Sequence, residues 1–96
     1  MSEMESVLGR VVVSRAGRDR GRAFLITGIA DDKHVYLADG ALRKSAHPKK
    51  KKLMHLHIEP VSAESIAAML KSGMAVQDAE IRKNLLALGY NTEKQK

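Results

Sequence analysis

The chain contains no cysteine, so neither a disulfide bond nor a zinc site built on thiolates can form. Such a chain suits a reducing compartment. Tryptophan is also missing, and two tyrosines and one phenylalanine are the only aromatic residues. No apolar run is long enough to cross a membrane, and residues 1–5 are acidic where a signal peptide is basic. We therefore expect a cytoplasmic protein without a membrane segment.

The sequence has 96 residues, enough for one small domain with a modest core. Its 44% hydrophobic and 29% charged residues are typical of a folded globular chain. The formal net charge is +6, and all of the excess lies early in the chain. Residues 1–58 hold twelve basic and six acidic side chains, whereas residues 59–96 hold five of each. This asymmetry favours a polyanionic partner, with nucleic acid ahead of a membrane because no predicted helix joins a basic face to a large apolar one.

The first part of the chain predicts short strands joined by turns, because β-branched and apolar segments are separated by turn-forming residues. The expected strands are residues 7–14, 23–29, 34–38, 41–43 and 53–58. Asp39-Gly40 predicts a tight hairpin that folds residues 41–43 back on the preceding strand. Residues 44–52 contain Pro48 and four consecutive lysines, and we expect a mobile loop there. Strands without intervening helices favour a small, curled antiparallel barrel.

Two short helices are predicted after Pro60, where the pattern changes. Ser62 is expected to cap the first helix and Gly73 to end it; the second begins near Gln77 or Asp78 and ends before Gly89. Apolar residues recur at helical spacing in both segments, namely Ile66, Met69, Leu70, Ile81, Leu85 and Leu88. Helices this short are marginal alone, so we expect these side chains to pack as core rather than to form a partner site. The expected domains are a barrel over 1–60 and a helical appendage over 61–96, with residues 91–96 as a frayed tail.

The segment between the first two predicted strands combines two glycines with several arginines. Glycine permits a tight turn and close approach of a ligand, and guanidinium groups suit phosphate oxygens. Backbone amides of such a turn also form a concavity that binds anions. The candidate phosphate-contacting residues in this arginine loop, residues 15–22, are Arg15, Gly17, Arg18, Arg20, Gly21 and Arg22. The alternative is an exposed hairpin with scattered charge.

A strand that reads Gly-Arg-Val, followed by Gly17, three residues, Gly21 and a basic residue, resembles the KOW motif of ribosomal proteins and transcription elongation factors. The likeness is greatest to the KOW-containing large-subunit ribosomal proteins of eukaryotes and archaea and to their small bacterial relatives. Gly17 and Gly21 match the family's glycines, and Arg22 matches its basic residue. Arg18 and Arg20 lie in the variable interior, so a contact by each is inferred from charge. Asp19 departs from a purely basic loop: we expect it to orient Arg18 or Arg20, and an adjacent phosphate would repel it.

The resemblance implies a mainly β fold with α, an SH3-like antiparallel barrel followed by two helices. It also implies that the arginine loop contacts RNA, and by analogy with the family this RNA is ribosomal. The expected protein is therefore a non-enzymatic, cytoplasmic RNA-binding protein associated with the ribosome or the transcription machinery. The alternative is a protein-interaction module that binds RNA polymerase or a ribosomal protein through the C-terminal helices.

A second basic segment follows the predicted hairpin. Its candidate RNA-contacting residues are Arg43, Lys44, Lys49, Lys50, Lys51 and Lys52. Lysines act as mobile point charges, so they are expected to add affinity and little sequence preference. The alternative is a solubilising loop, which is a common role of charge runs.

Other chemistry is poorly supported by the sequence. Residues 53–58 alternate, with Met54, Leu56 and Ile58 expected on one face and His55 and His57 on the wet one. These histidines lack the further ligands that a structural zinc site needs. Neither serine nucleophiles with predicted partners nor a nucleotide-binding motif is evident, so no enzyme activity and no cofactor are expected. The scarcity of aromatic rings limits base stacking and favours recognition of the shape and backbone of folded RNA.

Overall fold

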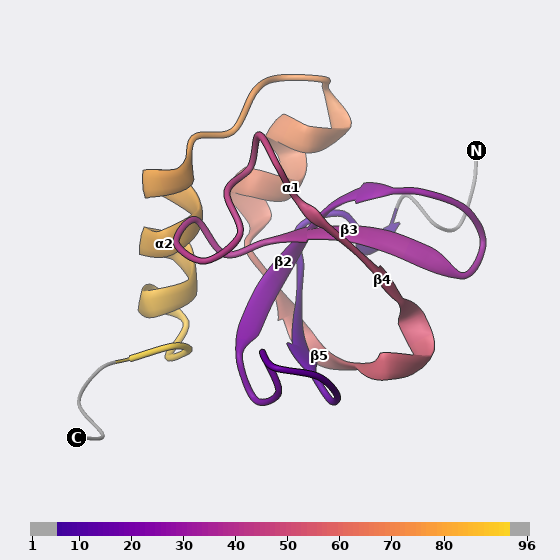
Figure 1. The fold of residues 1–96 in the computed structure, drawn as a ribbon. Helices are drawn as coiled ribbons and strands as arrows, with labels where there is room; N and C mark the ends of the chain where they lie inside the picture. The colour runs from indigo at the N-terminus through magenta and orange to yellow at the C-terminus, as the bar shows by residue number, and fades with distance from the viewer. Residues whose placement is uncertain (1–5, 93–96) are drawn as a thin grey trace.

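The computed structural model describes residues 6–92 and shows a five-stranded antiparallel sheet followed by two helices (Figure 1). The strands are β1 (Arg10–Ser14), β2 (Ala23–Ile29), β3 (His34–Ala38), β4 (Lys49–Lys52) and β5 (Leu56–Ser62). A short 3₁₀ turn, η2 (Leu53–His55), joins β4 to β5, and the helices are α1 (Glu64–Lys71) and α2 (Asp78–Ala87). The predicted class, mainly β with two C-terminal helices, is confirmed. Within residues 6–92 the sheet is curled but not closed into a barrel, because β4 and β5 are its two edges.

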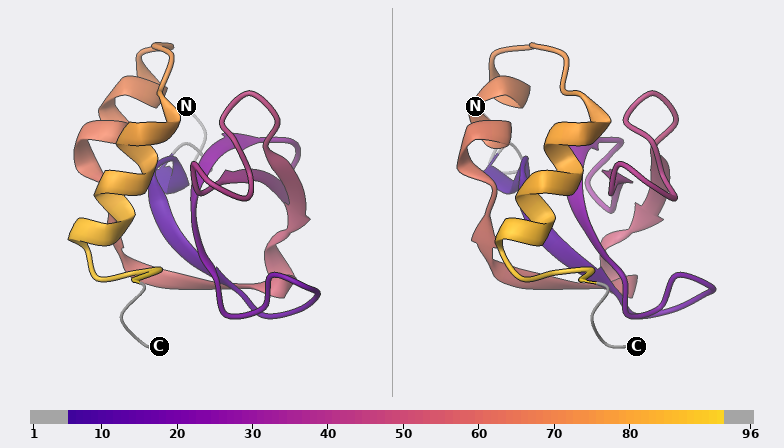
Figure 2. Two further views of the ribbon diagram at one scale, coloured as in Figure 1. Left: turned by 60° about the vertical axis from the view of Figure 1, so that its left-hand side comes forward. Right: turned by 90° about the vertical axis from the view of Figure 1, so that its left-hand side faces the viewer.

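Both faces of the sheet are covered, because β1 and β2 bury consecutive apolar side chains. Val11 pairs with Leu25 and belongs to the cluster under the helices, whereas Val12 pairs with Phe24 and belongs to the cluster inside the curl of the sheet. All four side chains are fully buried. The two helices lie side by side against the first of these faces (Figure 2). The first strand is therefore buried on both sides.

The helices share the core of the sheet. Ile66, Ile81 and Leu85 are fully buried in the same cluster as Val11 and Leu25, with Met69 and Leu70 packed against it. Leu88 differs from the expectation, because its side chain is 40% exposed. The remaining apolar stripe packs as core, as predicted.

Gly40 fastens the loop between β3 and β4 to α2. Its φ is +79°, and a Cβ there would lie 2.4 Å from the carbonyl oxygen of Asp78. Arg82 donates to the Gly40 carbonyl, and the Ser45 amide donates to Asp78 Oδ1 at 2.6 Å. A side chain at position 40 therefore has no room, and this loop has a fixed place beside the helix.

The segment from residue 39 to 52 is the main correction to the predicted strands. Residues 41–43 are not a strand: the Asp39 carboxylate accepts the amides of Ala41 and Arg43, which makes a side-chain-capped turn instead of a hairpin. The strand that pairs with β3 is the lysine run itself, with Val35 opposite Lys51 and Leu37 opposite Lys49. The prediction of a mobile loop over residues 44–52 is therefore wrong for the last four residues, which form β4.

Smaller differences occur at the element ends. The strand expected over residues 7–14 begins at Arg10, and residues 53–55 form η2 rather than strand. Met54 and Ile58 are 70% and 40% exposed, so the predicted apolar face buries Leu56 alone; His55 and His57 are exposed as expected.

The predicted start of the first helix was also wrong, since Pro60 lies within β5 and the N-cap residue is Ala63 without a side-chain cap. Gly73 follows the helix in the left-handed conformation expected of a helix stop. The expected frayed tail is wrong at Asn91, whose side-chain amide bonds both the amide and the carbonyl of Ala23, while residues 93–96 lie outside the described part. In the described part, no helix has the length and apolar character needed to span a membrane.

Candidate nucleic-acid interface

The arginine loop, residues 15–22, is the tip of the β1–β2 hairpin. Gly17 and Gly21 have φ values of +84° and +87°, so both adopt the left-handed conformation that glycine tolerates best. Short backbone bonds close the loop, including Gly21 N–H to the Ser14 carbonyl at 2.8 Å. Arg15, Arg18 and Arg20 project from it as exposed side chains, and among the described residues none of the three has an ion-pair partner. The loop therefore offers three free guanidinium groups.

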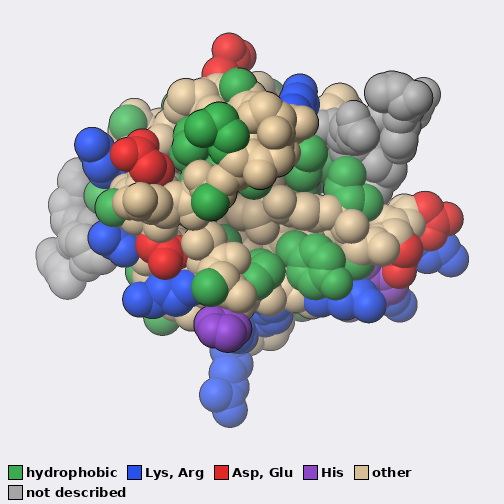
Figure 3. All heavy atoms as spheres, turned by 90° about the horizontal axis from the view of Figure 1, so that it is seen from above, with side chains coloured by type: hydrophobic (Ala, Val, Ile, Leu, Met, Phe, Trp, Pro, Cys, Tyr) green, Lys and Arg blue, Asp and Glu red, His purple; other side chains and the backbone are tan. Residues whose placement is uncertain are grey.

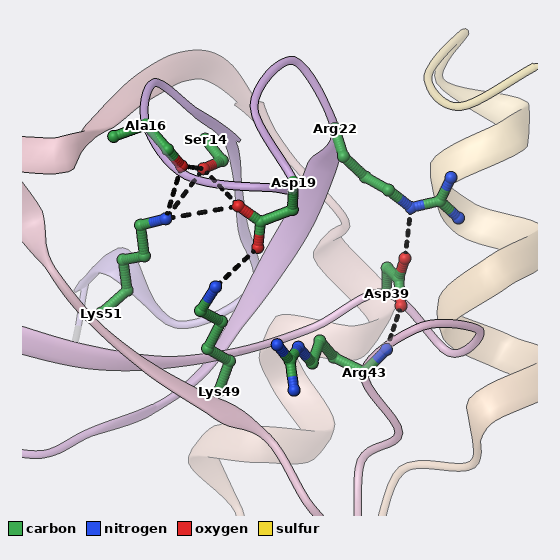
Figure 4. A network of polar contacts seen from close by, with 8 residues as sticks. All are labelled: Ser14, Ala16, Asp19, Arg22, Asp39, Arg43, Lys49 and Lys51. Carbon is green, nitrogen blue, oxygen red and sulfur yellow. Dashed lines mark hydrogen bonds and ion pairs between the residues drawn. The ribbon is translucent and has the colours of Figure 1, made fainter.

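Asp19 holds this loop against the lysine strand β4. Its Oδ2 atom lies 3.0 Å from Lys49 Nζ, and its Oδ1 atom lies 3.3 Å from Lys51 Nζ. Figure 4 shows both lysines extending from β4 towards this carboxylate. Two segments separated by thirty residues in the chain are thereby joined through side chains. The expectation that Asp19 orients Arg18 or Arg20 is wrong.

Lys51 is the centre of the buried part of this network. The residue is only 8% exposed, and its ammonium group donates to Ser14 Oγ at 2.9 Å and to the Ala16 carbonyl at 3.0 Å, besides Asp19. The Ser14 hydroxyl donates a hydrogen bond to Asp19 Oδ1 at 2.8 Å. A buried charge is tolerated when it is paired and fully hydrogen-bonded, which this arrangement achieves. Lys51 therefore acts as a positioning residue, and we do not include it in the proposed contact surface.

The same contacts determine the protonation of Asp19. Burial alone would raise the pKa of this carboxyl group, but hydrogen bonds from Lys49, Ser14 and Lys51 outweigh it and lower the pKa to about 2. Asp19 is thus ionised at neutral pH and neutralised internally. With its side chain only 9% exposed, it does not present a free negative charge to a phosphate at the loop.

The lysine run is divided between the two faces of β4. Residues directly opposite each other in a sheet project to the same face. Lys49 and Lys51 face the interior, like their partners Leu37 and Val35, whereas Lys50 and Lys52 are exposed. The lysines therefore do two different things: alternate members hold the arginine loop, and the others carry free charge.

Arg22 belongs to a second buried network. Its Nε donates to Asp39 Oδ2, and the Asp39 side chain has no exposed surface. Burial would raise the pKa of Asp39, but the amides of Arg43 and Ala41 and the Arg22 guanidinium together lower it. Arg22 thus fixes the turn after β3 as well as carrying charge. The Arg43 side chain extends from the same turn towards the side on which Lys49 lies (Figure 4).

The predicted basic residues lie on neighbouring segments but not all on one face of the sheet, because Lys50 and Lys52 project to the opposite face of β4 from Lys49 and Lys51. The right-hand view of Figure 2 shows the arginine loop, β4 and the loop between β3 and β4 on the side away from α1. Those that are exposed are Arg15, Arg18, Arg20, Arg43, Lys44, Lys50 and Lys52. Lys49, Lys51 and Arg22 are paired with carboxylates. The exposed cations therefore lie around β4 and the arginine loop, and the internal ionic network joins these two segments.

Two important residues, Ser14 and Asp39, were missed as positioning residues by sequence reasoning. Ser14 ends a valine-rich strand and is buried, and Asp39 was interpreted as a hairpin residue. A polar residue that continues a buried strand pattern was the available signal for Ser14. Nothing in the pattern indicated that Asp39 pairs with Arg22, because that contact depends on the register of β2 against β3, in which Leu25 lies opposite Ala38.

No protein-family model matches the chain, and no curated protein matches it. Within residues 6–92, no group of three or more histidine or acidic side chains is placed to hold a metal ion.

Acid should weaken the attachment of the arginine loop. The folded-state pKa of Asp19 is lowered, so its contribution is fully present above the unfolded pKa and is lost as the pH falls through the folded value. We expect the free energy of unfolding to fall between about pH 4 and pH 2, and to fall less steeply in Asp19→Asn. Urea denaturation over this pH range measures both slopes. Parallel slopes for the two proteins would show that Asp19 is not the titrating group.

Proposed function

We propose that this chain is a non-enzymatic RNA-binding protein. It contacts structured RNA with its arginine loop, with the exposed lysines of β4 and with the exposed basic residues of the loop that precedes β4. One observation carries the proposal. Asp19, the acidic residue of the loop, is turned inward and neutralised by Lys49 and Lys51, so that Arg15, Arg18 and Arg20 are left exposed without a carboxylate. A loop whose only acid is removed from its surface suits an anionic ligand.

The type of contact follows from the side chains. Guanidinium groups bind phosphate oxygens with two parallel hydrogen bonds, and ammonium groups bind as point charges. Both kinds of contact position a nucleic acid without reading its sequence. The proposed ligand is therefore a folded RNA recognised mainly through its backbone. The KOW-like pattern of Gly17, Gly21 and Arg22 favours ribosomal RNA and a cytoplasmic, ribosome-associated role.

A second candidate function is a protein contact made by the C-terminal helices. Leu86 on α2 and Leu88 directly after it are 49% and 40% exposed, and exposed leucines suit contact with a protein such as RNA polymerase or a ribosomal protein. Removing residues 61–96 cannot test this candidate, because Ile66 and Ile81 share the core of the sheet. The charge variants described next separate the two candidates, since only RNA binding depends on the loop arginines.

Replacing Arg18 and Arg20 with alanine should weaken binding to a structured RNA by about thirtyfold, equivalent to about 2 kcal/mol. Both side chains are exposed and have no ion-pair partner within residues 6–92, so the fold should be unchanged. Arg22 is left in place because it anchors Asp39. The measurement is fluorescence anisotropy with a hairpin transcript of ribosomal RNA at low salt, with circular dichroism to check folding.

The matched control is Lys71→Ala with Lys83→Ala, which removes the same charge from exposed positions on α1 and α2. We expect this control to bind within about twofold of the natural chain, since it alters only the distant field. Equal losses in the two double variants would show that net charge, and not the loop, governs binding. Full affinity in the arginine variant would contradict the proposal.

A further inference from the structure

A groove with a volume of about 460 Å³ lies at the end of the molecule opposite the arginine loop. The groove is bordered by β2 and β3, by the loop before β4 and by the connection between α1 and α2. The lining residues are Thr27, Gly28, Tyr36, Ser45, Ala46, Pro48, Leu70, Met74, Ala75 and Val76. Figure 3 looks onto this end and shows hydrophobic and uncharged surface in its middle, with most charged side chains towards the rim. Its volume is in the range of small-ligand sites.

The walls combine an aromatic ring with hydroxyl groups. Tyr36 lies across from Gly28, where a Cβ would come within 3.3 Å of the ring, so the absence of a side chain at position 28 leaves room for the tyrosine. Thr27 and Ser45, which carry hydroxyl groups, also line the groove, and the Thr27 hydroxyl donates to the Tyr36 carbonyl at 3.5 Å. Met74 is 58% exposed and supplies an adaptable apolar surface. An aromatic face with a few polar groups suits a flat heterocycle.

Most of the charges next to the groove are positive. No lining residue is charged. Lys44 precedes Ser45 in the chain, and Lys50 lies directly across from Tyr36 in the β3–β4 register. Both lysines are exposed, and neither has an ion-pair partner in the described part of the chain. The Asp78 carboxylate also lies near the groove, where it accepts the Ser45 amide. An occupant with an apolar ring and an attached anion matches both the walls and the rim.

We propose that this groove receives one unpaired nucleotide of the bound RNA, with its base against Tyr36 and its phosphate beside Lys50 or Lys44. The inference rests on the proposed RNA-binding function and deepens it. β4 runs between the groove and the arginine loop, because Pro48 lines the groove while Lys49 contacts Asp19. An RNA that crosses the exposed lysines of β4 therefore reaches both places. Since Tyr36 is the single aromatic lining residue, the site takes one base, at a loop, bulge or end of the RNA.

In the first experiment, a single-stranded RNA tetranucleotide is titrated into the natural chain, and binding is monitored by the amide chemical shifts of the protein in NMR spectra. We expect saturable shifts at Gly28, Ala46 and Ala75, which surround the groove. Tyr36→Phe keeps the ring and should retain the affinity, whereas Tyr36→Leu keeps an apolar side chain and should lose about tenfold, since a base stacked on an aromatic ring contributes strongly to binding. Equal affinities for the phenylalanine and leucine variants would overturn the proposal.

The outcomes separate this inference from the proposed function. If a hairpin transcript binds and depends on Arg18 and Arg20, but the groove amides do not shift with the tetranucleotide, the groove proposal is wrong and RNA binding stands. If neither RNA binds at low salt, both are wrong. Saturable shifts at the groove with an acidic, leucine-containing tetrapeptide and none with the tetranucleotide would identify a protein-binding groove and overturn the nucleotide site.

Discussion

Replacing Asp39 with alanine is expected to destabilise the domain by about 3–5 kcal/mol, a large part of the stability of a small protein. The Asp39 side chain has no exposed surface, and its carboxylate accepts the amides of Ala41 and Arg43 and the Arg22 guanidinium. Alanine would leave these donors without an acceptor and would release the turn between β3 and β4. Urea denaturation followed by circular dichroism measures the change in the free energy of unfolding.

A matched control for this substitution is Asp31→Ala. Asp31 also has a lowered pKa, of about 2, caused first by the His34 ring and then by the amides of Lys33 and His34. Its side chain is 49% exposed, so water replaces these partners when they are lost, and we expect a small effect. Asp39→Asn keeps an acceptor for the amides and removes the charge, so it should lie between the alanine variant and the natural chain. Similar stabilities for Asp31→Ala and Asp39→Ala would contradict the role assigned to Asp39.

The strands built from apolar residues were predictable from the sequence. Residues 23–29 and 34–38 match β2 and β3 in both bounds, because β-branched and aromatic residues bounded by turn formers favour strands. The left-handed glycines of the arginine loop were predictable for a similar local reason. In each case the information lies within a few neighbouring residues.

The lysine strand could not be predicted in this way. Four consecutive lysines have no local preference for a strand, and β4 forms because β3 supplies a pairing edge and Asp19 supplies a buried partner for Lys51. Exposed lysines also suit the edge of an open sheet, since they discourage pairing with another chain. Lys50 and Lys52 therefore protect this edge as well as carrying free charge.

The candidate site was predicted by residue type more than by arrangement. The sequence indicated which side chains carry positive charge, but not that Lys51 is buried, that Asp19 faces inward or that Arg22 holds Asp39. These contacts join segments that are distant in the chain, and they depend on strand register and on how the sheet curls. They reduce the number of free cations, and they also fix the positions of the segments that carry the remaining ones.

The salt dependence of RNA binding is the most direct test of the central claim that exposed cations around the arginine loop and β4 bind a polynucleotide backbone. Of the seven exposed basic residues, we expect about five to neutralise phosphates, each contributing a slope of about −0.7 where the contacted RNA is single-stranded and about −0.9 where it is a duplex. Affinity for a folded ribosomal RNA transcript should therefore fall by about a hundredfold to five-hundredfold between about 50 and 200 mM salt. Anisotropy titrations at several salt concentrations give the slope. A slope between about −3.5 and −4.5 is the predicted result; a flat salt dependence, or no binding at the lowest salt, would contradict the account.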